Sequence, residues 1–174
     1  MKRVLLAAAL AAALLAQRPR VKPASLTAME KSADQHVMRL LEDPFLLLGP
    51  ARGLYLEGYG AVFSAEINLV AGPTLNPFRQ AISKEEVVRV HTRKLQRLPG
   101  LRQTMRETLL AAAASLDEVP AEEKIAFEVK LLAQSYEDLS GLPSRIQMQG
   151  QRAKLVEAKL GRVAAESVIK VLEF

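Results

Sequence analysis

The sequence of 174 residues contains no cysteine and no tryptophan. Without cysteine, the chain cannot form a disulfide, use a thiol in catalysis or bind a metal through thiolate ligands. The same absence excludes a lipid-modified cysteine behind an export signal, so we do not predict a lipoprotein. Aromatic residues make up only 5% of the chain, and we therefore expect an aliphatic, alanine-rich core.

Histidines and known catalytic motifs are also scarce. The chain has two histidines, His36 and His91, and neither an HExxH nor an HxxxH spacing occurs. A GxSxG nucleophile elbow, a phosphate-binding loop and a GxGxxG motif are absent as well. Ser167 and Lys170 match the S-x-x-K spacing of penicillin-recognising enzymes, but neither partner motif accompanies them. We therefore predict no metal site and no cofactor.

The charge balance is mildly basic. The chain has 24 basic and 19 acidic residues, which gives a net charge of +5. Removing Lys2 and Arg3 with an N-terminal signal leaves 22 basic against 19 acidic residues, or about +3. A nucleic-acid-binding domain usually concentrates a stronger positive charge on one face, so we predict no nucleic-acid partner. A content of 49% hydrophobic and 25% charged residues is typical of a globular domain.

The first residues have the pattern of a bacterial secretory signal. Lys2 and Arg3 form a basic start, and Val4 to Ala16 is an apolar run of 13 residues. That run is shorter than the ~20 residues that a membrane-spanning helix needs. We predict a signal peptide over residues 1–16, an extended leader over 17–25 and no transmembrane span after signal removal. The expected location is therefore periplasmic or secreted.

Residues 52–70 form the most strand-like stretch of the chain. Gly53 to Leu56 is a short strand candidate, and the Glu57-Gly58 pair that follows favours a hairpin turn. The longer segment from Ala61 to Val70 alternates apolar and polar residues, which indicates a half-buried strand. Its predicted inward side chains are Ala61, Phe63, Ala65, Ile67 and Leu69. The RGLYLEGYGAVF block in this stretch resembles exported bacterial proteins, and the resemblance implies no particular activity.

Three polar or aromatic residues surround this turn, and they are the first candidate binding site. Tyr55, Glu57 and Tyr59 alternate with Gly58 and Gly60. One interpretation is a tight turn with an aromatic pair packed across it. The other is a loop that contacts a ligand, because small residues allow close approach and tyrosine offers a flat face and a hydroxyl.

Two capping-box spacings predict helix starts. Thr27 and Glu30 predict a helix that ends near Asp43-Pro44, with His36 at its exposed rim. Ser83 and Glu86 predict a second helix, which reaches Leu98 before Pro99-Gly100 breaks or kinks it. A further helix is expected from Leu101 to Leu116, where alanines are frequent.

The second helix carries the other candidate site. Arg89, Arg93 and Arg97 recur at four-residue spacing, with Lys94 nearby. Such a row is either a solvated helix face or an anion-binding strip. His91 falls among the apolar residues of the opposite stripe, so we interpret it as a residue at the edge of the core rather than a ligand or base.

The remaining elements follow from alternation and from glycine and proline punctuation. We expect Ala126 to point outward from its strand, between inward Ile125 and Phe127. A helix before Gly161 has that glycine in the usual position after its last turn. The predicted segments are a strand at Lys124–Leu132, a strand at Arg145–Gln149, a helix at Gln151–Leu160 and a strand at Ser167–Phe174.

These patterns predict a two-layer α+β domain over residues 26–174. We expect an antiparallel or mixed sheet of about five strands with helices packed on one face. The first functional hypothesis is a non-enzymatic envelope or secreted binding domain whose partner is an anionic envelope component or another protein. The second is a small hydrolase or lyase that uses His91 or His36 with a carboxylate such as Glu57 or Glu66. The third is a structural subunit that associates with copies of itself.

Overall fold

The computed structural model describes residues 21–40, 48–73 and 81–174. The predicted signal peptide and residues 17–20 of the predicted leader lie outside the described residues. Along the described part, the elements are α2 (Pro23–Leu40), β1 (Arg52–Leu56), β2 (Gly60–Ile67), α3 (Lys84–Ser115), β3 (Lys124–Leu131), β4 (Arg145–Gln151), α4 (Arg152–Lys159), α5 (Ala165–Val168) and β5 (Lys170–Glu173).

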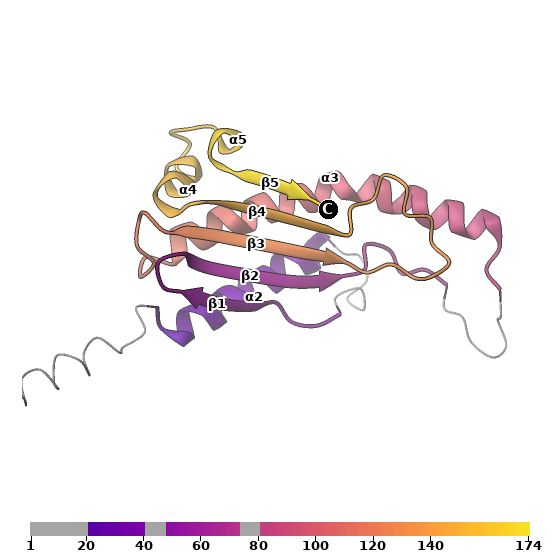
Figure 1. Ribbon diagram of the computed structural model, residues 1–174, viewed down its shortest axis with the longest axis horizontal. Coiled ribbons are helices and arrows are strands. Elements are labelled where there is room, and N and C mark those ends of the chain that lie inside the picture. Colours follow the sequence, from indigo (N-terminus) through magenta and orange to yellow (C-terminus); the bar gives the residue numbers. More distant parts are fainter. Residues whose placement is uncertain (1–20, 41–47, 74–80) are drawn as a thin grey trace, which may run out of the picture.

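The described strands form one five-stranded sheet in the order β1-β2-β3-β4-β5 (Figure 1). β2 and β3 run parallel, whereas the other neighbouring pairs are antiparallel. The parallel pair exists because α3 connects the end of β2 to the start of β3, as in a βαβ unit. The predicted α+β class is confirmed, and the sheet is mixed.

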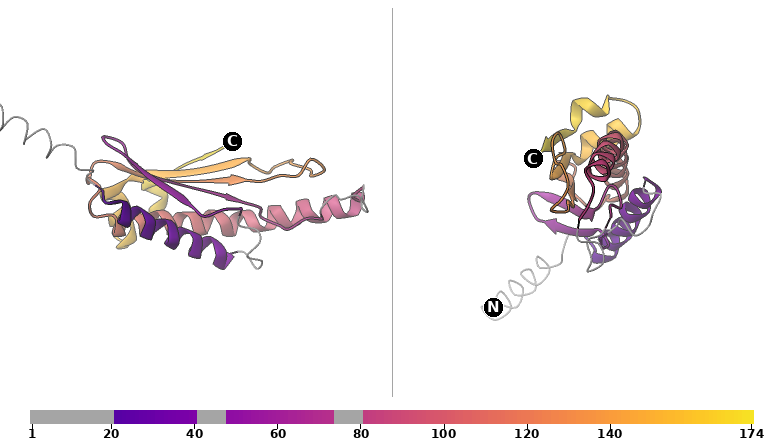
Figure 2. Two further views of the ribbon diagram at one scale, coloured as in Figure 1. Left: turned by 90° about the horizontal axis from the view of Figure 1, so that it is seen from below. Right: turned by 90° about the vertical axis from the view of Figure 1, so that its right-hand side faces the viewer.

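Among the described residues, the helices cover one face of the sheet and leave the other face open. α2 and α3 lie side by side beneath the strands, and α4 packs beside α3 on the same side (Figure 2). The alternation predicted for β2, β3 and β4 is confirmed, because the side chains that face the helices are buried, but β2 ends at Ile67 rather than at the predicted Val70. The largest of them are Phe63, Ile67, Ile125, Phe127, Ile146 and Met148.

The hairpin between β1 and β2 depends on two glycines. Gly58 has a φ of 80° and Gly60 a φ of 128°, which L side chains rarely adopt. Gly60 also lies against β3, where a Cβ atom at this position would come within 1.8 Å of the Lys124 carbonyl oxygen. The predicted turn is therefore present, and Gly60 joins it to the centre of the sheet.

The first described helix starts earlier than the sequence predicts. α2 begins at Pro23, so the last residues of the predicted leader, 17–25, are helical. The predicted capping box at Thr27 and Glu30 is wrong, because both residues lie inside α2. Proline is well placed at a helix start, where its missing N–H has no intrahelical acceptor. The predicted helix end at Asp43-Pro44 lies outside the described residues.

α3 is one helix where the sequence predicts two. The capping box of Ser83 and Glu86 is confirmed in both of its hydrogen bonds. The helix then continues for 32 residues through Pro99, so the predicted break is wrong. Leu98 and Leu101 are buried on either side of the proline. Both belong to the hydrophobic core, so packing supports the helix on each side of Pro99 and offsets the lost backbone hydrogen bond.

The last part of the chain agrees with the sequence except at one point. α4 ends before Gly161, whose φ of 73° closes the helix as predicted. The predicted final strand, Ser167–Phe174, is shorter than expected. Its first residues belong to α5, and β5 begins at Lys170.

Candidate functional site

The parallel strands β2 and β3 end at the same edge of the sheet. The chain leaves β2 through residues 68–73 and leaves β3 through the connection 132–144. The N-terminal half of α3, residues 84–98, lies beside both segments (Figure 1). In open sheets, ligands bind outside the carboxyl ends of parallel strands, where loops are held by a rigid scaffold. We call these three segments the strand-end site.

Arg89 and Arg93 form one wall of a groove in the strand-end site. The groove has a volume of about 120 Å³, and its other lining residues are Val70, Ala71, Pro73, Val90 and the N-terminal Glu86 of α3. Both arginine side chains are exposed. Neither takes part in a hydrogen bond or ion pair with any residue that the structure describes. Two arginines one helical turn apart therefore face this groove without a described protein partner.

Arg97, the third residue of the predicted arginine strip, has a different role. Its Nη1 atom donates a hydrogen bond to the Leu69 carbonyl oxygen at 2.6 Å, and the residue is half-buried. The bond ties α3 to the segment after β2. The predicted strip therefore divides into two available arginines and one that anchors the backbone.

A buried ion pair lies on the other side of α3, between Lys94 and Glu137. Their side chains are only 5% and 2% exposed. The Lys94 ammonium also donates to the Leu132 carbonyl oxygen at 3.0 Å. Grouping Lys94 with the solvated arginine row was wrong. Lys94 shares the buried stripe of Val90 and Leu98, which lie four residues to either side. This four-residue spacing from two apolar residues is the sequence pattern that indicates its burial.

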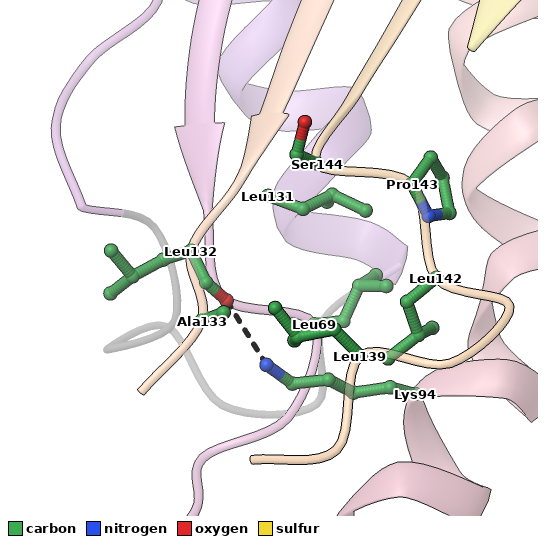
Figure 3. A pocket seen from close by; sticks show the side chains of 9 residues that line it. All are labelled: Leu69, Lys94, Leu131, Leu132, Ala133, Leu139, Leu142, Pro143 and Ser144. Carbon is green, nitrogen blue, oxygen red and sulfur yellow. Dashed lines mark hydrogen bonds between the residues drawn. The ribbon is translucent and has the colours of Figure 1, made fainter. Parts of the chain in front are cut away.

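Lys94 also borders a small cavity with apolar walls (Figure 3). The cavity has a volume of about 60 Å³, enough for a water molecule or two. Glu137 Oε1 is buried and has no hydrogen-bond partner among the described residues. Burying two charges is costly unless they are paired, and here the pair is electrically neutral. The other residues lining the cavity are Leu69, Leu131, Leu132, Ala133, Leu139, Leu142, Pro143 and Ser144.

Further hydrogen bonds fix the connection 132–144 in place. His91 Nδ1 lies 2.9 Å from the Asp138 carbonyl oxygen, and the Tyr136 hydroxyl donates to the Pro73 carbonyl oxygen at 2.6 Å. The hydroxyl and backbone N–H of Ser140 donate to the Asp138 carboxylate at 2.7 and 2.9 Å. With His91 nearby, they hold the pKa of Asp138 below its usual value.

The predicted turn site is not brought together by the fold. Tyr55 packs against the core on the helix-covered side. The Tyr59 hydroxyl instead donates to Gln149 Oε1 at 3.1 Å, across β3 on the open face. Lys124 Nζ lies 5.4 Å from the centre of the Tyr59 ring. The Glu57 side chain is exposed and forms no described contact with either tyrosine.

Glu123 and Ala126 are two further residues that contact or adjoin this turn. Glu123 is buried, and its Oε1 atom accepts the backbone N–H of Gly58 at 3.0 Å, which anchors the turn. Ala126 points to the open face as predicted but is fully buried. The ring of Tyr59 crosses β3 at this point, which accounts for that burial.

Within the described residues, no hydrogen bond or ion pair joins a histidine to a carboxylate, so no such contact supports the hydrolase or lyase hypothesis. His91 contacts a backbone carbonyl oxygen, and His36 is half-buried on α2. Glu66 is paired with Lys130 at 2.6 Å on the open face. The described residues also contain no cluster of three or more metal-ligating side chains.

No protein-family model matches the chain, and no curated protein or solved structure matches it. Among the described residues, no helix combines the length and the hydrophobicity that crossing a bilayer requires. The function has to be inferred from the geometry of the strand-end site.

Proposed function

We propose that this chain is an exported, non-enzymatic binding domain that recognises an anionic ligand in the groove of the strand-end site. The ligand carries phosphate or carboxylate oxygens, which contact Arg89 and Arg93. The observation that carries the proposal is the position of these two arginines, which are exposed, line a groove and have no partner among the described residues.

The chemistry of arginine supports this ligand class. A guanidinium group is always charged at physiological pH and presents several N–H donors in a planar fork that matches carboxylate and phosphate. Arg89 and Arg93 lie four residues apart, so their side chains leave the same side of α3 about 6 Å apart. Val70 and Val90 add an apolar part to the groove lining, beside the two guanidinium groups.

The scaffold around the groove supports binding rather than chemistry. Arg97, His91 and Tyr136 tie the flanking segments to α3 and to each other through hydrogen bonds. The arginines therefore project from a rigid helix beside anchored loops, an arrangement that lowers the entropy lost on binding. The apolar N-terminal run supports export of the domain.

Three anionic probes test the proposal. Inorganic polyphosphate and citrate are titrated into the chain by calorimetry, and vesicles containing phosphatidylglycerol are tested by co-sedimentation, each at low and high salt. We expect binding at low salt that weakens at high salt. Binding to polyphosphate or citrate alone identifies a soluble anion, whereas binding to vesicles alone identifies a lipid headgroup. Failure of all three probes to bind at low salt contradicts the proposal.

A further inference from the structure

The two edge strands of the sheet are protected differently. At the β1 edge, carboxylates of α2 accept hydrogen bonds from backbone N–H groups. At the opposite edge, β5 pairs with β4 alone among the described strands. An edge strand without a partner on its outer side presents a row of backbone donors and acceptors that another strand can use.

Alternation along β5 determines which of its backbone groups point outward. Phe174 donates its backbone N–H to the Arg145 carbonyl oxygen on the β4 side at 3.1 Å. The other even-numbered residues of β5 share this orientation, because backbone groups alternate in direction along an antiparallel strand. Val171 and Glu173 therefore direct their N–H and C=O groups away from β4.

Apolar side chains are exposed along the same edge of the molecule. Val171 is 42% exposed and Phe174 63%. On the connection between α4 and α5, Leu160 is 58% exposed and Val163 41%. This connection lies beside the start of β5 (Figure 1). A partner strand at this edge therefore also removes apolar surface from water.

We infer that β5 is the interface of a homodimer in which two copies pair their β5 strands antiparallel across a two-fold axis at Leu172. In this register, Val171 of one copy lies opposite Glu173 of the other, and the outward backbone groups of both residues are hydrogen-bonded. Leu172 meets its counterpart on the open face of the sheet. Lys170 lies opposite Phe174, where a cation beside an aromatic ring is favourable.

The symmetry of antiparallel pairing favours a second copy of β5 as the partner, and the length of β5 favours this register. A two-fold interface uses the same surface twice, and β5 is self-complementary in this sense. Shifting the register so that Val171 faces itself would place Glu173 opposite Ile169, which precedes the strand. That residue belongs to the end of α5 and is buried. The register centred on Leu172 therefore pairs more residues of β5 than the register centred on Val171 does.

Engineered cysteines test the register directly. Because the chain has no cysteine of its own, a covalent dimer reports only the introduced thiol. In the inferred dimer the two Leu172 Cα atoms form a non-hydrogen-bonded pair about 4.5 Å apart, within the range of about 4.4–6.8 Å that disulfides span. The two Lys170 Cα atoms lie roughly 14 Å apart by the rise of a strand.

The comparison uses Leu172→Cys and Lys170→Cys variants of the full chain, oxidised and run on a non-reducing gel. We expect Leu172→Cys to shift from 19.1 kDa to twice that mass, while Lys170→Cys remains at 19.1 kDa. Equal cross-linking of both variants, or cross-linking of neither, overturns the inference.

Sedimentation velocity supplies a second test that needs no new covalent bond. The unmodified chain is expected to sediment as a dimer. Leu172→Lys places two like charges at the axis and is expected to give a monomer. Leu54→Lys makes the same substitution on the open face at the opposite edge strand, where Leu54 is already exposed, and is expected to remain dimeric. A monomeric unmodified chain, or identical behaviour of the two variants, overturns the inference.

Discussion

The Glu30 carboxylate on α2 accepts a hydrogen bond from the backbone N–H of Gly53 on β1, at 2.7 Å. One helical turn later, Asp34 Oδ1 accepts the backbone N–H of Ala51 at the same distance. Four residues of helix rise about 6 Å, and two residues of strand about 6.8 Å, so the two carboxylates match alternate outward N–H groups of the edge. The helix thus protects the strand from pairing with another chain.

Removing the first of these acceptors tests this account of the edge. We expect Glu30→Ala to lower the free energy of unfolding by about 1–2 kcal/mol, because a half-buried N–H group loses a charged acceptor. Lys31→Ala is the matched control, since Lys31 is exposed on the same helix, and it should change stability by less than about 0.5 kcal/mol. Urea unfolding measures both variants. Equal losses would mean that the hydrogen bond to β1 contributes nothing.

A substitution at Gly60 tests the contact between the hairpin and β3 at the centre of the sheet. We expect Gly60→Ala to destabilise the fold by about 3 kcal/mol or more, because the added Cβ overlaps the Lys124 carbonyl oxygen and φ is unfavourable for alanine. Gly49→Ala is the control, because a Cβ there meets no atom within 4 Å among the described residues. Thermal unfolding compares the two. A Gly60→Ala variant as stable as the control would contradict this packing.

The buried pair of Lys94 and Glu137 predicts strong coupling between the two residues. Lys94→Met leaves a carboxylate buried without its cation, and we expect a loss of about 3–5 kcal/mol in the free energy of unfolding. The double variant Lys94→Met/Glu137→Leu removes both charges, so it should lose less than Lys94→Met alone. Denaturant unfolding of Lys94→Met, Glu137→Leu and the double variant completes this double-mutant cycle. Losses that simply add would show that the two charges do not interact.

The pair of Arg102 and Glu173 predicts a pH dependence. Arg102 donates hydrogen bonds to both Glu173 oxygens, at 2.7 and 2.8 Å, and lowers the pKa of that carboxyl from its ordinary value of 4.5. A lowered folded-state pKa contributes stability above the unfolded pKa, and this stability is lost as the pH falls through the folded pKa. Both groups are partly exposed, so we expect only about 0.5 kcal/mol at neutral pH.

The measurement for this pair is the difference in unfolding free energy between the unmodified chain and Glu173→Gln. The difference should be present at pH 7 and should shrink as the pH falls below 4.5 and through the lowered folded-state pKa of Glu173. A difference that is constant across this range would show that Glu173 acts through packing rather than through its charge.

Local patterns predicted those parts of the fold that depend on neighbours in sequence. The Ser83 and Glu86 capping box lies within one helical turn, and the alternation in β2 and β3 follows from a single buried sheet face. The continuity of α3 through Pro99 was not predictable in this way. It depends on packing against strands that are distant in sequence.

The candidate site was predicted only in part for the same reason. The spacing of Arg89 and Arg93 identified two side chains that share a groove, but the residues of the segment after β2 that complete it are not local. Lys94 is buried because Glu137, 43 residues further along the chain, pairs with it. No pattern around either residue alone indicates this contact.

The central claim is that the Arg89 and Arg93 groove binds an anion, and paired charge reversals test it most directly. The double variant Arg89→Glu/Arg93→Glu is compared with Arg39→Glu/Arg52→Glu, which changes two exposed arginines away from the groove and alters the net charge equally. Both variants retain the N-terminal segment and Arg97. A difference in binding between the variants therefore cannot come from either of these features.

Calorimetric titration with inorganic polyphosphate at low salt gives the readout for the unmodified chain and both variants. The account predicts that the groove variant loses at least ~10-fold in affinity, equivalent to about 1.4 kcal/mol, and most of its salt dependence, while the control variant keeps most of its affinity. Equal losses in the two variants, or no loss in the groove variant, would contradict it.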